Sequence, residues 1–183
     1  MRKVLFTISS LRLFVIFTIM MGGFCSSVSG QGVNYRVQSL YMYKFSKFIT
    51  WPENKSKDQF VIGVYGNSPI YEEMKIMASI KTAGNNQEIV VKQINTIDEL
   101  EENYHMLYVA SSKSREIRQI ALLMNGKSVL IVAERDGLAS KGAGINFMIM
   151  ENDILKFEVN QYELESHGLI ISPELLKLGF VVG

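Results

Sequence analysis

Four short apolar runs, separated by helical patterns and polar loops, constrain the fold of this 183-residue chain most strongly. Each run is rich in valine, isoleucine and leucine and nearly free of polar residues, which is typical of a strand that is covered on both faces. Strands that alternate with helices predict a parallel sheet with helices packed on its faces. The runs occupy residues 60–66, 89–94, 106–110 and 129–133.

A helix is predicted before the first of these strands, over residues 35–52, because apolar residues recur there at three- and four-residue spacing. The helix should end at Trp51-Pro52, since the residue before a proline is pushed out of the helical region. We expect its apolar face to lie on the sheet. The residues of that expected face are Val37, Leu40, Tyr41, Phe45 and Phe48.

Capping residues predict where the other helices begin. Serine followed by proline starts a helix from residue 68 to about residue 80 and a last one from residue 172 to residue 178. Capping boxes predict a short helix near residues 98–103 and another from residue 160 to about residue 168. A serine pair starts the helix that ends at Asn125-Gly126. The capping residues are Ser68, Thr96 with Glu99, Ser111-Ser112, Asn160 with Glu163, and Ser172.

The alternating pattern changes after residue 134. A glycine-rich loop precedes two apolar segments, residues 145–150 and 154–159, which a short polar turn separates. This arrangement predicts an antiparallel hairpin. We therefore expect a single three-layer α/β domain over residues 31–183, with a mostly parallel sheet of about six strands, helices on both faces and a hairpin near the C-terminus.

Residues 1–30 have the layout of a secretory signal peptide. Arg2 and Lys3 precede an apolar core at residues 13–21, and small polar residues follow it. We expect cleavage after Gly30. The apolar core is well short of the ~20 residues that a spanning helix needs, which argues against an uncleaved anchor. Cys25 leaves lipidation as a third interpretation, although Phe24 before it is larger than such sites prefer.

Cys25 is the only cysteine, so a chain cut after Gly30 has no disulfide and depends on its core alone. About 150 residues are enough for one domain with such a core. Removal of the leader takes away three of the 19 basic residues and none of the 18 acidic ones, which leaves a net charge of −2. This balance excludes a basic field for nucleic acid.

No motif for a nucleotide or a metal is complete. Residues 125–128 (NGKS) resemble the end of a P-loop, but Ala121 stands where the motif needs glycine, and a helix precedes the segment instead of a strand. Residues 142–144 (GAG) resemble half of a dinucleotide fingerprint, but no helix follows, and a turn with positive φ explains them better. His105 and His167 lie on different elements with no cysteine to complete a zinc site, so both are expected to be ordinary surface or strand-end residues.

Catalytic motifs are also missing. Ser111-Ser112 lacks the surrounding glycines of a nucleophile elbow, so helix capping explains the pair. The carboxylates near the loops are expected to be solvated turn residues; they are Glu134, Asp136, Glu151 and Asp153. We expect no enzymatic activity, no cofactor and no bound metal.

Asn146 is the polar residue that most needs an explanation, because it interrupts an apolar strand. A buried amide without a hydrogen bond costs roughly 1–3 kcal/mol. Its side chain either ties the glycine loop to the sheet, which we favour, or lines a ligand pocket at the strand ends, where open α/β sheets bind ligands. The residues of that candidate pocket are Ser111, Gly142, Gly144 and Asn146.

Several segments together resemble the YfiR-like family of bacterial periplasmic proteins, from about residue 37 to residue 178. Trp51-Pro52 and residues 144–147 (GINF) are the most specific of them. The resemblance implies a non-enzymatic periplasmic α/β domain that holds down an inner-membrane diguanylate cyclase by binding its sensor part, so that release raises cyclic di-GMP. Other members lie beside sensor kinases. The segments are YKFSKFITWP, FVIGVYG with residues 67–69, MLYVASSKS, VLIVAE with Gly137, GAGINFMI and ISPELLKL.

The first functional hypothesis is therefore an interaction protein whose partner is the periplasmic domain of an inner-membrane receptor or diguanylate cyclase. Candidate contacts are Tyr43, Lys44, Lys47 and Trp51, which are aromatic and basic residues on or just after the first helix; Trp, Tyr and Arg tend to dominate interfaces. Trp51 has an equally good explanation as a plug at the end of the core. The second hypothesis is a periplasmic small-ligand binding module. The oligomeric state, a homodimer included, stays open, and a cysteine-based redox switch like that of some family members is not expected.

Overall fold

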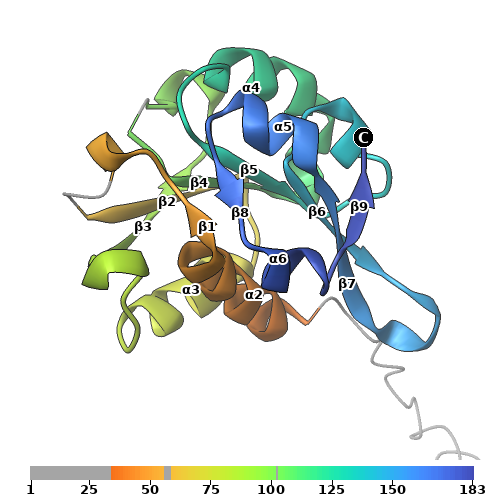
Figure 1. The fold of residues 1–183 in the computed structure, drawn as a ribbon, viewed down its shortest axis with the longest axis horizontal. Coiled ribbons are helices and arrows are strands. Elements are labelled where there is room, and N and C mark those ends of the chain that lie inside the picture. Colours follow the sequence, from red (N-terminus) through yellow and green to blue (C-terminus); the bar gives the residue numbers. More distant parts are fainter. Residues whose placement is uncertain (1–33, 56–58, 102) are drawn as a thin grey trace, which may run out of the picture. The chain divides into compact units, whose positions relative to one another are not determined.

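A seven-stranded sheet runs through the part of the chain that the computed structural model describes, residues 34–55, 59–101 and 103–183 (Figure 1). The expected leader, its cleavage after Gly30 and Cys25 lie outside these residues. The strand order is β3-β2-β4-β5-β6-β7-β9. The strands are β2 (Phe60–Tyr65), β3 (Ile89–Ile94), β4 (Met106–Val109), β5 (Leu130–Ala133), β6 (Ile145–Ile149), β7 (Leu155–Asn160) and β9 (Phe180–Val182).

The predicted parallel sheet and hairpin are confirmed. Neighbours from β3 to β6 are parallel, β6 and β7 form the antiparallel hairpin, and β9 runs parallel to β7. The sheet has seven strands instead of about six because the segment after the last helix pairs with β7. A separate two-stranded ladder joins β1 (Ile49–Thr50) to β8 (Ile170–Ile171), and the sequence pattern predicted neither strand.

Helices cover both faces of the sheet, as expected. In Figure 1, α2 (Tyr35–Phe48), α3 (Ile70–Ala78) and α6 (Pro173–Leu176) lie below the sheet, and α4 (Ile117–Met124) lies above it. The helix α5 (Gln161–Ser166) is drawn next to α4, but its buried Leu164 belongs to the same apolar cluster as the buried side chains of α2 and α3. No helix within the described ranges is long and apolar enough to span a membrane. Short 3-10 helices are η1 (Glu53–Lys55), η2 (Gly84–Asn86), η3 (Ile97–Glu99), η4 (Ser111–Glu116), η5 (Ala139–Lys141) and η6 (Glu151–Asp153).

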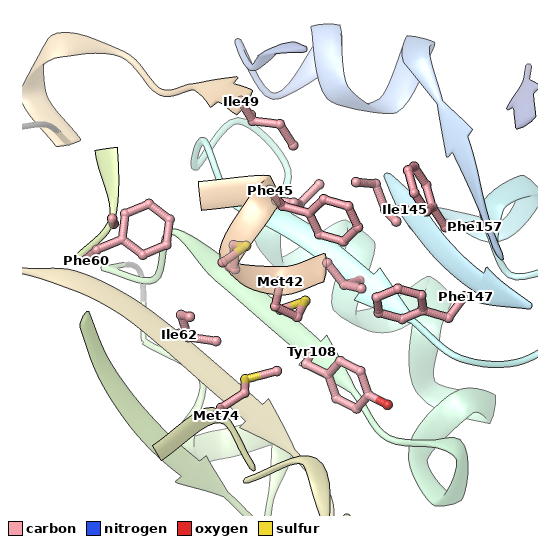
Figure 2. Close-up of a cluster of buried hydrophobic side chains, with 14 of the residues drawn as sticks. Met42, Phe45, Ile49, Phe60, Ile62, Met74, Tyr108, Ile145, Phe147 and Phe157 are labelled. Carbon is pink, nitrogen blue, oxygen red and sulfur yellow. The ribbon is translucent and has the colours of Figure 1, made fainter. Parts of the chain in front are cut away.

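The central strands are buried on both faces because successive side chains point to opposite sides. In β2, Ile62 and Val64 belong to the apolar cluster under α2 and α3, whereas Val61 and Tyr65 belong to the cluster under α4. Figure 2 shows Met42 and Phe45 of α2 among the side chains of the first cluster. This double burial explains why the strands appear in the sequence as nearly continuous apolar runs.

The prediction of which residues form the buried face of α2 was partly wrong. Phe45 is fully buried, but Leu40 and Phe48 are 48% and 41% exposed. The buried stripe is displaced, and it includes Gln38 and Met42. The spacing of apolar residues predicted the face that contains most of them. The tertiary structure instead buries the side-chain amide of Gln38, which has a hydrogen-bond partner in Tyr108. The helix also ends at Phe48, earlier than expected, because the next two residues pair with β8.

Two of the five predicted caps, Asn160 and Ser172, are confirmed by their hydrogen bonds, whereas the side chains of Ser68 and Thr96 do not cap the helices that follow them. The side chains of Asn160 and Ser172 accept from the backbone N–H groups of Glu163 and Leu175, at 3.2 Å in each case. The Thr96 hydroxyl donates to the Glu99 carboxylate at 3.0 Å, although the turn that follows is the short η3. These local contacts mark the residues at which the helices begin.

Candidate functional site

The residues predicted to contact a partner lie on and just after α2. Tyr43 is half-buried, and the ammonium groups of Lys47 and Lys81 lie 5.8 and 5.6 Å from its ring centroid. Lys44 is exposed, one turn before Lys47, and its ammonium group lies 5.9 Å from the Tyr41 ring. Tyr43, Lys44, Lys47 and Lys81 together are called the α2 basic surface below.

A cavity of about 550 Å³ adjoins the α2 basic surface, between Tyr43 and the segment that follows α3. Ile80, which is 72% exposed, and Lys81 line it, and Glu88 is its acidic residue. The Lys47 ammonium group donates to the backbone carbonyl of Ala83 at 2.8 Å, so it also fastens α2 to this segment. The surface thus combines three cations, an aromatic ring and an exposed aliphatic side chain, and of these residues tyrosine is the type enriched in protein interfaces.

Trp51 lies inside the domain and is only 8% exposed. Its indole N–H donates to the backbone carbonyl of His105 at 3.1 Å, and its ring meets Phe60 edge to face at 5.0 Å. This geometry fits the interpretation of Trp51 as a plug at the end of the core. Little of the indole is accessible to a partner.

The structure does not bring Ser111 of the predicted ligand pocket together with Gly142 and Gly144. Ser111 follows the carboxyl end of β4, whereas Gly144 packs against Leu130 at the start of β5, at the other end of the parallel strands. Gly142 has a φ of +111° and lies against Ala121 of α4. The expectation of a turn with positive φ in this loop is therefore confirmed at Gly142.

Asn146 is fully buried, and its side chain joins β6 to β7. The amide nitrogen donates to the Glu158 carboxylate at 2.9 Å, so the favoured expectation of a bond to the glycine loop was wrong. The amide oxygen has no partner among the described residues. The neighbouring strand β7 thus provides a hydrogen-bond partner for the amide nitrogen of Asn146. Local sequence could not indicate this partner, because Glu158 is twelve residues away.

A buried polar network that the sequence analysis missed lies near the carboxyl ends of β4 and β5. The Tyr108 hydroxyl donates to the side-chain oxygen of Gln38 at 2.8 Å, and both side chains are buried. Burial, with the nearby Glu134 carboxylate as a second cause, raises the pKa of Tyr108 far above its ordinary value. Tyr108 is therefore a permanent hydrogen-bond donor and not an acid–base group. A glutamine on the buried side of α2 was the signal that could have indicated it.

Glu134 has a structural task instead of the solvated role expected for it. Its carboxylate accepts the backbone N–H of Ser111 at 2.8 Å, at the start of η4. No side chain of the serine pair caps η4, so the expectation that Ser111-Ser112 cap a helix was wrong. Glu134, Gln38, Arg135 and Asp136 also line a cavity of about 350 Å³ with residues of the hairpin. We call it the strand-end cavity.

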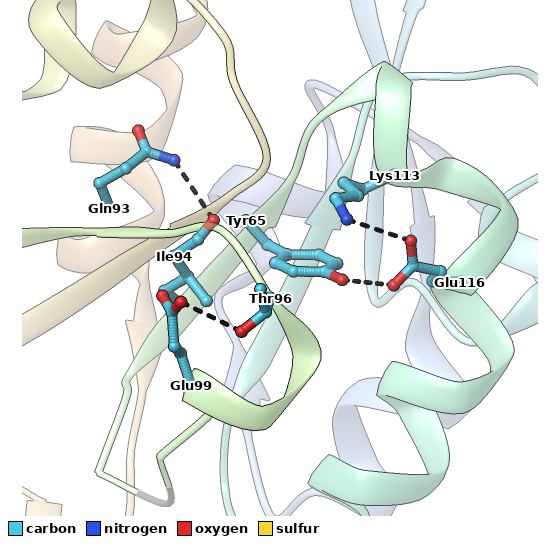
Figure 3. A network of polar contacts seen from close by, with 7 residues as sticks. All are labelled: Tyr65, Gln93, Ile94, Thr96, Glu99, Lys113 and Glu116. Atoms are coloured by element: carbon cyan, nitrogen blue, oxygen red, sulfur yellow. Dashed lines mark hydrogen bonds and ion pairs between the residues drawn. The ribbon is translucent and has the colours of Figure 1, made fainter.

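A second polar cluster lies at the carboxyl end of β2, on the side of α4 (Figure 3). The hydroxyl of the buried Tyr65 bonds to the Glu116 carboxylate, which also pairs with the Lys113 ammonium group at 3.4 Å. Burial and the bond to Glu116 raise the pKa of Tyr65. Tyr65 therefore stays protonated, and the cluster fastens β2 to η4 instead of providing reactive groups.

Both histidines are buried, so the surface position expected for them was wrong, whereas the strand-end position is confirmed for His105, which directly precedes β4. His105 Nδ1 accepts the backbone N–H of Val61 at 3.1 Å, and Nε2 lies 2.7 Å from the backbone carbonyl of Lys55. The ring therefore links the start of β4 to β2 and to η1. His167 is 6% exposed, and its Nδ1 has no partner among the described residues. The described ranges contain no group of three or more acidic, histidine or cysteine side chains placed to hold a metal ion.

Comparison with known proteins supplies the identity that the geometry does not. No curated protein matches the chain. The family model described as YfiR/HmsC-like matches residues 35–179, which include the helix α2 and the strands β2 to β7 with the hairpin, but not β9. The chain therefore belongs to the YfiR/HmsC-like family.

Proposed function

We propose that this protein is a non-enzymatic periplasmic regulator that binds the periplasmic sensor part of an inner-membrane signalling protein, a diguanylate cyclase or a sensor kinase. The observation that carries the proposal is family membership over residues 35–179, since this family is regulatory rather than catalytic. The leader predicted from the sequence supports a periplasmic location, where such sensor parts lie. The protein controls its partner by binding one of two receptor states more tightly than the other.

The α2 basic surface is the proposed contact. Lys44 and Lys81 are exposed and have no hydrogen bond or ion pair to another described residue, so a partner could use both charges. Three lysines beside a tyrosine and an exposed isoleucine fit an acidic partner surface with an apolar centre. Opposite charges raise the association rate and align the two surfaces, which suits a regulator that must bind and release.

The experiment uses the tagged protein as bait for solubilised inner membranes, with mass spectrometry of the captured proteins. We expect capture of a membrane-spanning protein whose cytoplasmic part is a cyclase or kinase. The double variant Lys44→Glu, Lys81→Glu should capture about tenfold less, since two favourable charge pairs become repulsive. Arg115→Glu is the matched control, because Arg115 is exposed on η4, before the helix that covers the other face of the sheet.

Two results would count against this proposal. If no cyclase or kinase is captured by the native protein, the regulatory role fails. If capture is normal in the double variant, or falls equally in the Arg115 control, the partner binds elsewhere and the α2 basic surface is excluded.

A second candidate function is small-ligand binding in the strand-end cavity, which the position of that cavity favours. It lies beside the carboxyl end of β5, where open α/β sheets commonly bind ligands, and it offers a carboxylate and a guanidinium group. A thermal-shift screen of the purified protein against small metabolites tests it. A saturable rise in melting temperature that the Gln38→Ala variant loses would support the candidate, and a flat screen would oppose it.

A further inference from the structure

A different cavity lies between α4 and α5, where neither proposal above assigns a role. Its volume is about 450 Å³, and side chains of α4, η5 and α5 line it. Gly142 allows this arrangement, because a Cβ there would lie 2.5 Å from the Cβ of Ala121. The η5 loop therefore approaches α4 closely enough to close one wall of the cavity.

Two cations reach this cavity from separate elements. Arg118 comes from α4 and Lys141 from η5, and both are exposed. Neither has an ion pair or a hydrogen bond to another residue in the described part of the chain. Glu163 is the carboxylate in the wall, so the lining carries a net charge of +1 with His167 neutral. A cavity with two uncommitted cations attracts an anion, and guanidinium and ammonium groups bind carboxylates and phosphates with charge-assisted hydrogen bonds.

His167 supplies an independent observation at the same cavity. It is more than nine-tenths buried, its Nδ1 has no partner among the described residues, and its Nε2 lies 4.0 Å from the Glu163 carboxylate. A buried polar atom without a partner is costly and uncommon in native structures. The His167 residue lines this cavity, whereas its Nδ1 atom is itself inaccessible to solvent.

The rim of the cavity is apolar. Leu122 is 77% exposed and Tyr162 is 72% exposed, and both line the opening. Exposed side chains of this size can cover the apolar body of a ligand whose charged end lies deeper. The volume is within the range of small-molecule sites, which is about 300–1,000 Å³.

We propose that this cavity between α4 and α5 binds a small organic oxyanion, in which a carboxylate or phosphate group is attached to an apolar or aromatic body. Arg118 and Lys141 hold the charged group. Leu122 and Tyr162 pack on the body. The site is separate from the α2 basic surface, so the inference does not depend on the proposed regulatory function.

The test titrates the purified protein with phenyl phosphate, benzoate, inorganic phosphate and the neutral amide benzamide, with calorimetry and amide NMR as readouts. We expect saturable binding of phenyl phosphate or benzoate, weaker binding of inorganic phosphate, and none of benzamide. The NMR shifts should centre on α4, η5 and the His167 ring. Arg118→Gln or Lys141→Gln should weaken the binding about tenfold or more, because each removes a hydrogen bond to a charged group.

Arg115→Gln is the matched control, since Arg115 is exposed near α4 but does not line the cavity. It should leave the affinity unchanged. Arg118 and Lys141 are exposed, so their replacement should also leave the melting temperature unchanged. The proposal is overturned if the native protein binds neither organic anion, if benzamide binds equally well, or if all three variants keep the native affinity.

Discussion

The two faces of the sheet are built differently. Among the described residues, the cluster against α2 and α3 contains 25 buried apolar residues, including four phenylalanines and Trp51, whereas the cluster against α4 contains 14, none of them phenylalanine or tryptophan. The second face also carries the polar cluster around Tyr65. Because apolar burial is the main stabilising term, the first face should contribute more to the stability of the domain than the second.

Truncation of a large aromatic side chain in the first face should have the largest effect. Phe45 is fully buried, and its ring centroid lies 5.8 Å from that of Phe147 and 5.2 Å from that of Phe157. Phe45→Ala should lower the free energy of unfolding by about 3–5 kcal/mol, which urea denaturation measures. Ile120→Ala on α4 is the matched truncation and should cost less, near 2–3 kcal/mol. Equal losses would contradict the contrast between the faces.

Gly142 tests how tightly the second face is packed around its cavity. Gly142→Ala combines a left-handed conformation, which costs about 1–2 kcal/mol for other residues, with a clash against Ala121 that adds about 1–3 kcal/mol. Gly126→Ala is the control, since Gly126 also has positive φ but has no neighbour within 4 Å of the added Cβ. Thermal melting should show the larger loss for Gly142→Ala. Similar losses would mean that the loop moves aside at little cost.

Removal of one tyrosine hydroxyl from each face compares their polar networks. Tyr108→Phe leaves the buried side-chain oxygen of Gln38 without its donor and should cost about 1–3 kcal/mol. Tyr65→Phe should cost less, near 1 kcal/mol, because the Glu116 carboxylate keeps its ion pair with Lys113 and the Glu116 side chain is 35% exposed to solvent. Chemical denaturation of both variants measures the difference. The reverse order would show that the network around Gln38 is satisfied in another way.

The smallest expected effect is on the pH dependence of the stability of the domain, through His167 beside the cavity. Burial lowers the pKa of His167 below its ordinary value of 6.5, and Glu163 opposes this only in part. Below pH 6.5 the unfolded chain therefore binds a proton that the folded domain binds less readily, so stability falls as the pH decreases through this window. In His167→Gln the free energy of unfolding should fall less steeply between pH 7 and pH 5. Parallel pH profiles of the two proteins would contradict the assignment.

Local patterns were sufficient for much of the fold. The apolar runs predicted β2 to β5, the polar turn at residues 151–153 predicted the hairpin, and Asn160 and Ser172 marked helix starts. The strand order was not predictable. The chain passes from β3 at the edge across β2 to β4, and periodicity does not encode which strand becomes a neighbour. The short strands β1, β8 and β9 were missed because pairing, and not their own composition, defines them.

The candidate sites divide in the same way. Spacing along one helix was enough to place Tyr43, Lys44 and Lys47 on one surface, since residues three and four apart are neighbours. Lys81 joins them only through the fold. The cavity between α4 and α5 depends on Arg118 and Lys141, which are more than twenty residues apart, and no local motif connects them.

The sequence by itself determined the class of this protein: an α/β domain with a parallel sheet, a terminal hairpin, no catalytic motif and a resemblance that the family model confirms. These features follow from short-range periodicity and capping, which are written within a few residues of one another. The tertiary structure alone decided that Gln38 and Trp51 lie inside, that Glu134 caps η4, and where the cavities open. Burial and hydrogen-bond partners are properties of residue pairs far apart in the chain, so only the folded domain defines them.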